Sequence, residues 1–426
     1  MSPSSGRPRV VIIGGGFGGL SAARAFRHAP VDVLLIDRRN HHVFQPLLYQ
    51  VATAALSPGD IASPIRWILR KQRNVEVWLA DATAIDTVSQ RVILADGEVQ
   101  YDYLIVSTGA THTYFGHDEW RAFAPGLKTL EDALDMRRRV LLAFEEAERA
   151  TDARERRRLL TFVVIGGGPT GVELAGALAE ISRHALKHDF RSIAPETARI
   201  ILIEGGPDVL PTYPAPLPGF ARRALERLGV AVWTGTRVTG LERGRVRVTD
   251  ETIEAETILW AAGVAASPLG ASLGGERDRA GRVVVTPDLS IPNHANVFVV
   301  GDLAVFKTAD GRALPGVAQV AMQQAAHAAH NIVRTVEGRE RTPFAYRNYG
   351  ELATIGRNSA VADFGWMRLK GYVAWLAWLF IHVVKLIGFR NRLSVMTQWA
   401  FAYLSYQRSV RLITGPAPPM PAGRQS

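Results

Sequence analysis

The chain has 426 residues, of which 47% are hydrophobic and 21% charged, an ordinary globular composition that confines expected disorder to the two Pro-, Ser- and Gly-rich ends. Its formal charge of +10 indicates a negatively charged partner, which can be nucleic acid, a lipid headgroup or a phosphate-bearing cofactor. Cysteine is absent, which excludes disulfides, thiolate metal sites and dithiol redox chemistry.

The first predicted element is a strand at residues 9–13, "RVVII", followed by glycines in the spacing G-x-G-x-x-G and then by a helix-like pattern. In this arrangement Gly14 makes a tight turn, Gly16 lets the backbone approach a pyrophosphate, and Gly19 lets helix and strand pack closely. A second strand, "VDVLLID", ends in Asp37, which can accept hydrogen bonds from a ribose. A glycine-rich turn that opens an ordinary helix is the alternative, but strand, helix and acid together favour a dinucleotide-binding unit.

The same pattern occurs a second time. The stretch "LLTFVVIGGGPTGVELAGALAEI" contains Gly166, Gly168 and Gly171, and a further strand, "ARIILIEGG", leads to Glu204. The separation between glycines and acid is longer than the usual ~20 residues, because "SRHALKHDFRSIAPET" lengthens the connection. Two complete units in one chain indicate two cofactors, placed so that a hydride can pass between them.

Three further segments complete a known arrangement. Residues 101–110, "YDYLIVSTGA", close the first unit, residues 257–264, "TILWAAGV", close the second, and residues 296–304, "NVFVVGDLA", return to the first. Together with the two G-x-G-x-x-G patterns, called fingerprints below, these segments resemble the two-dinucleotide-domain flavoproteins. Residues 40–66, "NHHVFQPLLYQVATAALSPGDIASPIR", and residues 318–325, "AQVAMQQA", are similar to narrower segments of type II NADH dehydrogenase, the single-subunit NADH:quinone oxidoreductase. The resemblance covers nearly the whole chain.

The resemblance implies an α/β fold with two Rossmann-like dinucleotide-binding domains and a C-terminal helical segment that anchors the chain to a membrane. The expected order is the first part of an FAD-binding domain at 1–115, an NADH-binding domain at 116–285, the second part of the FAD-binding domain with a quinone-site helix at 286–345, and the membrane-anchoring domain at 346–426.

The resemblance also implies the cofactors, which are non-covalently bound FAD and NADH. The residues that it assigns to FAD are Gly14, Gly16, Gly19, Asp37, Gly109 and Asp302, and those that it assigns to NADH are Gly166, Gly168, Gly171, Glu204 and Gly263. An acid at Glu204 repels a 2′-phosphate, so NADH is expected in preference to NADPH. On spacing alone Asp302 can instead cap the next element. A glycine is expected where Ala54 and Ala55 stand.

Three residues are expected to take part in the reaction. The resemblance places Glu173 near the nicotinamide and flavin rings, where its carboxylate can organise the site or serve a proton path, since quinone reduction takes two protons. The alternative is an acid in the first turn of its helix, favoured by the helix dipole. Gln319 and Gln323 share one helix face, with Gln324 turned away, and their neutral amides suit quinone carbonyls. A solvated helix face is the alternative for this pair.

No metal site is expected. His327 and His330 stand at i, i+3 on the same predicted helix, but they have no acid or cysteine partner close in the sequence. We therefore expect ordinary core or surface histidines rather than metal ligands.

From Phe364 to Ser426 the chain has eight Lys or Arg residues and no Asp or Glu. The aromatic residues interleaved with them are Trp366, Tyr372, Trp375, Trp378, Trp399, Tyr403 and Tyr406. This combination is typical of a segment that lies on an anionic membrane. Residues 372–389 approach the length of a membrane span, but His382 and Lys385 favour two helices in one leaflet, although Lys385 can snorkel. A hydrophobic dimer interface is the structural alternative, and both can share the surface.

These features predict a non-proton-pumping enzyme that passes a hydride from NADH to FAD and two electrons to a membrane quinone, either menaquinone or ubiquinone. We expect a monotopic protein on the cytoplasmic face of the cell membrane, since the start of the chain lacks an export signal, and we expect a homodimer that binds no nucleic acid.

Other functions fit the sequence less well. The absence of cysteine excludes glutathione-, thioredoxin- and sulfide:quinone-reductase chemistry. An NADH oxidase and an NADH–ferredoxin-type reductase remain as alternatives, but neither explains the basic, aromatic C-terminal region. A redox-sensing protein that binds nucleic acid is disfavoured, because the positive charge gathers where the chain is most hydrophobic.

Overall fold

The structure is a computed structural model that describes residues 6–249, 251–308, 311–405 and 410–415. The described residues belong to two compact units, which are treated separately. The first unit contains residues 1–43, 62–113 and 263–350, and the second contains residues 44–61, 114–262 and 351–426. Tyr406 and most of the two chain ends with predicted disorder lie outside the described residues.

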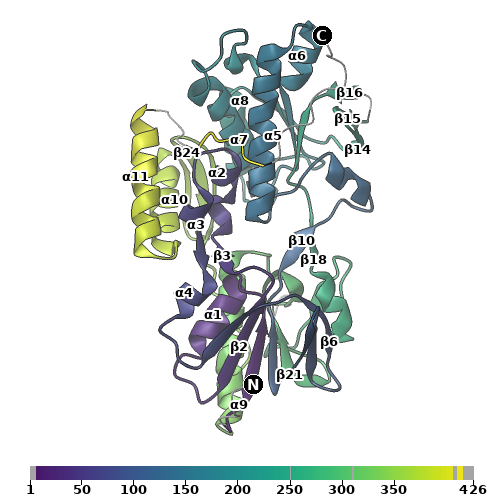
Figure 1. Cartoon of the computed structure of the whole chain (residues 1–426), viewed down its shortest axis with the longest axis vertical. Coiled ribbons are helices and arrows are strands. Elements are labelled where there is room, and N and C mark those ends of the chain that lie inside the picture. Colours follow the sequence, from purple (N-terminus) through teal and green to yellow (C-terminus); the bar gives the residue numbers. More distant parts are fainter. Residues whose placement is uncertain (1–5, 250, 309–310, 406–409, 416–426) are drawn as a thin grey trace. The chain divides into compact units, whose positions relative to one another are not determined.

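A six-stranded sheet in the order β20-β21-β9-β1-β2-β5 forms the centre of the first unit (Figure 1). Its strands are β1 (Arg9–Ile13), β2 (Asp32–Asp37), β5 (Val75–Leu79), β9 (Tyr103–Val106), β20 (Ser290–Ile291) and β21 (His294–Val299). All neighbours pair in parallel except β20, which is antiparallel to β21. The middle strand β1 is buried from Val10 to Ile13, which explains its uninterrupted apolar sequence.

Two helices lie side by side in the first unit, α1 (Phe17–Ala25) and α9 (Ala318–Val336). Small residues allow their close approach, since a Cβ atom at Gly18 would lie 3.6 Å from the carbonyl oxygen of Ala321. The other elements of the unit are α4 (Ile65–Leu69), β3 (His41–Val43), β4 (Ala62–Pro64), β6 (Ala82–Asp86), β7 (Arg91–Leu94), β8 (Gly97–Gln100), β10 (Ala110–His112), β18 (Val264–Ala266), β19 (Val283–Val284), β22 (Ala304–Val305), and the 3₁₀ turns Pro268–Leu273 and Gly301–Leu303.

The second unit is built on a four-stranded parallel sheet in the order β13-β12-β11-β17. These strands are β11 (Thr161–Ile165), β12 (Arg199–Ile203), β13 (Val230–Trp233) and β17 (Thr257–Trp260). The helices of the unit are α2 (Leu48–Ala52), α3 (Pro58–Ile61), α5 (Leu130–Arg149), α6 (Ala153–Leu159), α7 (Pro169–Glu180), α8 (Leu217–Arg227), α10 (Tyr372–Lys385) and α11 (Phe389–Ser405).

Two antiparallel three-stranded sheets complete the second unit. One consists of β14 (Val238–Glu242), β15 (Arg245–Val248) and β16 (Glu251–Glu254), and the other of β23 (Glu351–Gly356), β24 (Ser359–Asp363) and β25 (Arg368–Gly371). Helix α7 packs directly on β23, because a Cβ atom at Gly176 would lie only 1.7 Å from the carbonyl oxygen of Ile355. The absence of a side chain at Gly176 thus sets the distance between this helix and this sheet.

The observed architecture agrees with the predicted α/β class with two dinucleotide-type sheets and a C-terminal helix pair. The predicted domain boundaries describe a different quantity, since a compact unit is defined by packing and a cofactor domain by its ligand. They therefore stay a prediction.

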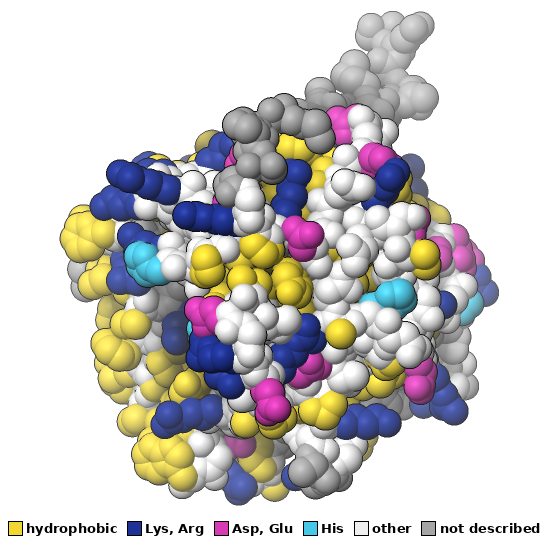
Figure 2. Space-filling model, turned by 90° about the horizontal axis from the view of Figure 1, so that it is seen from below, with side chains coloured by type: hydrophobic (Ala, Val, Ile, Leu, Met, Phe, Trp, Pro, Cys, Tyr) yellow, Lys and Arg dark blue, Asp and Glu magenta, His cyan; other side chains and the backbone are white. Residues whose placement is uncertain are grey.

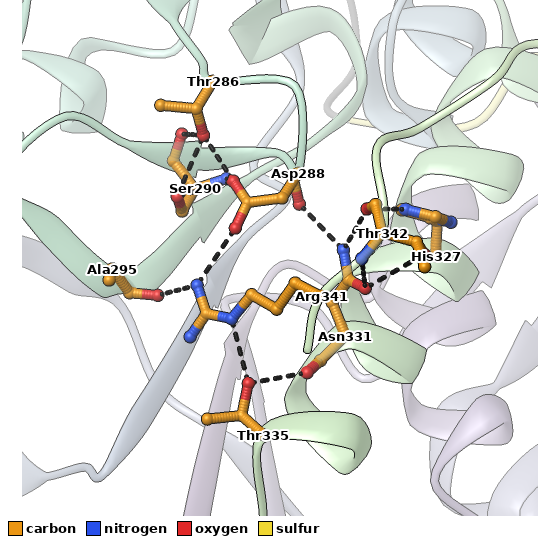
Figure 3. Close-up of polar contacts among 9 residues, drawn as sticks. All are labelled: Thr286, Asp288, Ser290, Ala295, His327, Asn331, Thr335, Arg341 and Thr342. Atoms are coloured by element: carbon orange, nitrogen blue, oxygen red, sulfur yellow. Dashed lines mark hydrogen bonds and ion pairs between the residues drawn. The ribbon is translucent and has the colours of Figure 1, made fainter. Parts of the chain in front are cut away.

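The C-terminal end of α9 and the β20–β21 hairpin are joined by a polar network around Asp288 (Figure 3). One carboxylate oxygen of Asp288 accepts hydrogen bonds from the hydroxyls of Thr286 (2.5 Å) and Ser290 (2.8 Å), and the other accepts one from the guanidinium of Arg341 (3.1 Å). These donors lower the pKa of Asp288 from 3.8 to about 2 although partial burial opposes the shift.

The same network fixes the segment that follows α9 (Figure 3). Arg341 donates through Nε to the hydroxyl of Thr335, at 2.9 Å. Asn331, which is fully buried, donates to the carbonyl oxygen of Thr342 (2.9 Å) and accepts from its backbone N–H (3.0 Å). His327 reaches the same carbonyl at 2.8 Å. One face of helix α9 is thereby fastened to the segment that follows it.

We expect Asp288→Asn to destabilise the protein at pH 7 by about 1 kcal/mol, after discounting for solvent screening. The native pKa is depressed, so the stabilisation is present above the unfolded-state value near 4 and is lost as pH falls towards 2. Thermal melts of wild type and variant should therefore differ at pH 7 and converge near pH 3. The exposed control Asp96→Asn should change little at either pH, and an equal gap at both pH values would contradict the assignment.

Candidate active site

One strand in each of the two main sheets is followed by a glycine loop, and the two loops have the same geometry. Gly14 follows β1 with a φ of +98°, and Gly166 follows β11 with a φ of +109°, a region that favours glycine strongly. Each amide donates to the neighbouring strand at 2.8 Å, from Gly14 to Ile36 and from Gly166 to Ile203. The two turns predicted from the sequence thus have one backbone design.

The third glycine of each fingerprint is required by packing inside the loop. A Cβ atom at Gly19 would lie 1.7 Å from the carbonyl oxygen of Gly14, and one at Gly171 would lie 1.8 Å from that of Gly166. No side chain fits at either position, which explains why the first turn of each helix can begin directly against its strand.

The second glycine of each fingerprint has a different reason. A Cβ atom at Gly16 or at Gly168 would have no described protein atom within 4 Å, and both backbones have a negative φ that other residues adopt easily. Packing among the described residues therefore does not require glycine here. Glycine is required here if the loop backbone approaches a ligand closely, as it approaches a pyrophosphate in dinucleotide-binding units.

The helices that follow present free backbone donors to such a ligand. Neither α1 nor α7 has a side-chain N-cap bond or an acid in its first turn. The first N–H groups of a helix have no partner inside the helix, and their dipoles favour an anion. Each glycine loop, together with the first turn of the helix that follows it, is called a cradle below: the first cradle contains residues 14–19 and the second contains residues 166–171. Both cradles fit the diphosphate of a dinucleotide cofactor.

An acid closes each cradle at the end of the second strand. Asp37 accepts hydrogen bonds from the backbone N–H groups of Gly15 (2.5 Å) and Arg39 (2.6 Å). Glu204 accepts the equivalent bond from Gly167 (2.6 Å) and a second from Gly206, also 2.6 Å. The carboxylates therefore lie beside the loops, where the sequence predicts that they bind a ribose.

The remaining predicted cofactor residues lie on tight turns. Gly109 and Gly263 have φ values of +68° and +74° and precede the paired strands β10 and β18. Asp302 lies in the 3₁₀ turn Gly301–Leu303, and a Cβ atom at Gly316, just before α9, would lie 3.2 Å from its Oδ1. Cofactor binding and capping both stay predictions for Asp302.

Glu173 lies in the second turn of α7, because the helix begins at Pro169 and has no acid in its first turn. The expectation of a first-turn acid is wrong, and the helix dipole, whose effect fades beyond that turn, does not account for this residue. Burial raises the pKa of Glu173 well above 4.5, and a hydrogen bond from the backbone of Thr354 opposes the shift only in part. A buried carboxyl whose pKa is raised is suited to proton transfer.

Tyr213 shares the surroundings of Glu173. Burial raises the pKa of the Tyr213 phenol well above 10, and the negative charges of Glu351, Glu173 and Asp363 add to the shift. Glu351 and Asp363 are register partners on β23 and β24, and the pKa of Glu351 is raised by burial first and by Asp363 second. The region around Glu173 thus disfavours negative charge.

Gln319 and Gln323 both point to the extended segment that precedes β23. Gln323 donates to the carbonyl oxygen of Arg347 (2.9 Å) and accepts from its N–H (3.0 Å), and Gln319 binds Tyr349 N–H (3.1 Å) and Gly350 O (3.0 Å) in the same way. Amides one helical turn apart match alternate residues of an extended chain. These contacts account for the spacing of the pair, and one hydrogen of each amide NH₂ group remains for another acceptor.

Hydrogen bonds between side chains, called the polar clasp below, join α11 to the segment at residues 45–61. The carboxylate of Asp60, which is buried, accepts hydrogen bonds from Ser394 (2.7 Å) and Gln398 (2.9 Å) of α11. Next to it, the indole of Trp399 donates to the side chain of Gln50 at 2.8 Å. The segment that carries the narrow resemblance is therefore fastened to the C-terminal helices.

The same segment contains the position where a glycine is expected. Ala54 is buried and has a φ of +56°, a left-handed conformation that costs an alanine ~1–2 kcal/mol. The expectation of a glycine thus has a physical basis in this turn.

The C-terminal helices are shorter than the apolar stretch suggests. Helix α10 ends at Lys385 and α11 begins at Phe389, so the predicted continuous stretch is broken. Among the residues that the structure describes, no helix has the length and apolar character that a membrane crossing needs.

Comparison with known proteins places the chain in a family. The model of the pyridine nucleotide-disulphide oxidoreductase family matches residues 8–325, and that of the NDH2 C-terminal domain matches residues 349–410. The type II NADH:quinone oxidoreductase Ndh of Mycobacterium tuberculosis is 47% identical over 96% of this chain and 90% of the relative. The chain belongs to the type II NADH:quinone oxidoreductase family.

Other members and a solved structure agree with this assignment. The enzyme NdhA of Mycobacterium tuberculosis is also 47% identical, over 97% of this chain and 91% of its own. The structure of NDH2 from Plasmodium falciparum in complex with NADH has a TM-score of 0.86, 20% identity, and coverage of 96% of this chain and 100% of that chain. At this identity the structure supports the fold of the family alone.

Several residues of this family member escaped prediction from the sequence. Gln324 is buried and accepts from the backbone N–H of Gly301 at 2.8 Å, so it supports the turn of Asp302. Asp60 lies within the family-like segment, but its partners on α11 are more than 300 residues away. The local sequence gives one signal for the role of Asp60, which is a single acid in a largely apolar segment.

We expect Gly16→Ala to reduce the amount of flavin retained by the purified enzyme at least tenfold while leaving the fold intact. Its Cβ would meet no described protein atom, but in the expected complex it would crowd the pyrophosphate that the loop binds. The matched variant Gly19→Ala should instead lower expression and the melting temperature, because its Cβ overlaps Gly14 O. Absorbance near 450 nm per mole of protein and thermal melts measure both; full flavin content in Gly16→Ala would contradict the cradle.

We expect Glu173→Gln to raise the melting temperature at pH 8 and to have little effect near pH 4. The native pKa is raised above the unfolded-state pKa of about 4.3. As pH rises above 4.3, the unfolded state gains stability by releasing this proton while the native state keeps it, so the wild-type protein becomes less stable, and the glutamine variant does not. Melts across this pH range test the sign. A difference that does not change with pH would show that Glu173 ionises freely.

Proposed function

We propose that the chain transfers a hydride from NADH to non-covalently bound FAD and passes two electrons to a quinone of the membrane. The observation that carries the proposal is the presence in one chain of two complete dinucleotide cradles, each closed by a carboxylate bonded to its glycine loop. The names of the Mycobacterium tuberculosis relatives, type II NADH:quinone oxidoreductases, support the pair of substrates.

The residues of the two cradles divide between the two cofactors in this proposal. FAD is held by the first loop with its acid, by Gly109 and by Asp302, and NADH by the second loop with its acid and by Gly263. The carboxylate of Glu204 favours NADH over NADPH, because a 2′-phosphate would lie against a negative charge. Bound FAD supplies the group that accepts a hydride and passes electrons on in pairs.

Glu173 is the proposed residue that handles protons. Quinone reduction consumes two protons, and a buried carboxyl with a raised pKa can hold a proton and give it up. Glu173→Gln should therefore slow quinone reduction more than it slows flavin reduction by NADH.

Gln319 and Gln323 are the proposed donors to the quinone carbonyls. Each amide is already oriented by two backbone bonds to residues 347–350, and its second N–H can serve a ligand. Neutral donors suit a quinone, since they bind its carbonyls without a buried charge.

The proposed membrane surface is the outer face of α10 and α11. Aromatic pairs hold the two helices together, with ring centroids 5.4 Å apart in Trp378–Trp399 and 5.7 Å apart in Trp375–Tyr403. Their outward side chains form an exposed apolar set, namely Val373, Leu376, Phe380, Val384, Phe389, Leu393 and Met396. Figure 2 shows hydrophobic side chains gathered at the left of its view, the side where α10 and α11 lie in Figure 1, with Lys and Arg among them.

This surface gives the enzyme its proposed location, monotopic on the cytoplasmic face of the membrane, where NADH is available and anionic lipid attracts the basic residues. We also propose a homodimer, to which part of the same apolar surface contributes. Light scattering of the detergent-solubilised enzyme separates a dimer from a monomer.

We expect an anaerobic titration of the purified enzyme to show both half-reactions. NADH should bleach the flavin band near 450 nm, and a short-chain quinone should restore it. Recovery only with oxygen would favour an NADH oxidase, recovery only with a ferredoxin would favour the ferredoxin-type reductase, and absence of a flavin band would overturn the proposal.

We expect Phe380→Ser, at a side chain 71% exposed on α10, to weaken co-sedimentation with anionic vesicles about tenfold, since burying a phenyl ring in lipid contributes ~1.5–3 kcal/mol. Flavin reduction by NADH should stay unchanged. The control Val88→Ser alters an apolar residue of the first unit that is 87% exposed, and this variant should bind vesicles as wild type does. Equal loss in both variants would argue against a specific lipid surface.

A further inference from the structure

The short helix α4 presents a basic and aromatic surface on the first unit. Two of its residues one turn apart, Ile65 and Leu69, are buried, and they fix which face of the helix points inward. Arg66, Trp67 and Arg70 lie on the remaining faces and are exposed, and the indole of Trp67 is 46% exposed. The outward side of α4 therefore combines two cations with an exposed aromatic ring.

The segment that follows α4 adds further cations and is fastened to the C-terminal end of α1. The buried side chain of Gln72 donates to the carbonyl oxygen of Ala23 at 2.7 Å. Asn74 donates to the carbonyl oxygens of Phe26 (2.9 Å) and Val31 (3.0 Å). These bonds place the exposed Lys and Arg residues of two segments on one part of the unit, namely Arg24, Arg27, Arg66, Arg70, Lys71 and Arg73.

The positive charge of these six residues is not compensated within their own segments. Residues 17–31 and 61–75 contain no Asp or Glu. None of the six forms an ion pair with another described residue, whereas Arg91 of the same unit pairs with Glu98 at 2.7 Å. Uncompensated cations that are held together attract a partner with negative charge.

The exposed apolar side chains of this surface distinguish between the anionic partners. The guanidinium of Arg70 lies over the ring of Trp67, 4.2 Å from its centroid, so that face of the ring is not available to stack on a base. Strand β5, which contacts α4, adds Trp78 and Leu79 with exposures of 39% and 64%. Aromatic and apolar side chains among cations are typical of a surface that lies in the headgroup region of an anionic bilayer.

We propose that the α4 patch, which consists of the six cations with Trp67, Trp78 and Leu79, binds the anionic headgroups of a lipid bilayer. The patch lies in the first unit and shares no residue with the outer face of α10 and α11, so the inference goes beyond the proposed function. The cations supply the attraction to the charged headgroups, and the indoles and the leucine enter the interfacial layer. The unit that contains the first cradle thus has a lipid contact of its own.

The test neutralises part of the patch in the full-length holoenzyme. The patch variant combines Arg70→Gln, Lys71→Gln and Arg73→Gln. The control variant combines Arg277→Gln, Arg279→Gln and Lys307→Gln, which removes the same charges from exposed residues elsewhere on the first unit. Co-sedimentation is measured with vesicles of equal parts phosphatidylglycerol and phosphatidylcholine, and melting temperatures and flavin content show whether each variant remains folded.

We expect the patch variant to bind these vesicles at least tenfold more weakly than wild type, because each Lys or Arg near an anionic surface strengthens binding. The control variant should bind as wild type does. Equal binding by all three proteins would overturn the proposal. Unchanged vesicle binding together with lost retention on duplex DNA would assign the patch to nucleic acid and would overturn it as well.

The variant Phe380→Ser, measured in parallel, separates this inference from the proposed function. Loss of vesicle binding in Phe380→Ser but not in the patch variant would confine lipid contact to α10 and α11, so the inference would fail while the proposed membrane surface stands. Loss in the patch variant but not in Phe380→Ser would support the inference and remove the proposed surface.

A second measurement detects lipid contact without removing a charge. The chain contains no cysteine, so Trp67→Cys provides one site for a polarity-sensitive fluorophore. The emission of this label should shift to the blue when phosphatidylglycerol-containing vesicles are added. The same label in Val88→Cys, at a position 87% exposed on the first unit, should not shift. An unshifted label at residue 67 in vesicle-bound enzyme would contradict the proposal.

Discussion

The structure depends on a close contact between the two ends of a short glycine loop. In both cradles the third glycine lies so near the carbonyl of the first that even a methyl group would overlap it. Because of this contact the helix starts directly at the end of the strand, and its free N–H groups face the space above the sheet. The position of the acid on the next strand follows, since parallel pairing of β1 with β2 and of β11 with β12 brings the strand ends together.

The features that were predictable from the sequence are those whose partners lie close in the chain. The loops, the acids and the parallel strands each leave a pattern within about 40 residues, and the structure places them as expected. Glu173 shows where such local reasoning fails. It lies one turn farther into α7 than the sequence predicts, and its raised pKa arises from burial, which no local pattern reveals.

Contacts between distant segments were beyond prediction for the same reason. The i, i+4 spacing of Gln319 and Gln323 was visible, but their partners at residues 347–350 are backbone groups, which leave no trace in side-chain identity. The clasp of Asp60 with Ser394 joins residues 334 positions apart. Two C-terminal helices were predicted, but the apolar sequence that continues from α10 to Phe389 hid the position at which the first helix ends.

The bonds between the acids and the glycine loops have a consequence for how this protein can change its cofactor. Glu204 accepts hydrogen bonds from Gly167 and Gly206 through its two oxygens, so the group proposed to set the preference among nicotinamide cofactors also keeps the loop in shape. A mutation that removes this carboxylate in order to admit a 2′-phosphate also leaves two backbone amides without their acceptor. A change of cofactor at this position therefore needs a second change that restores the order of the loop.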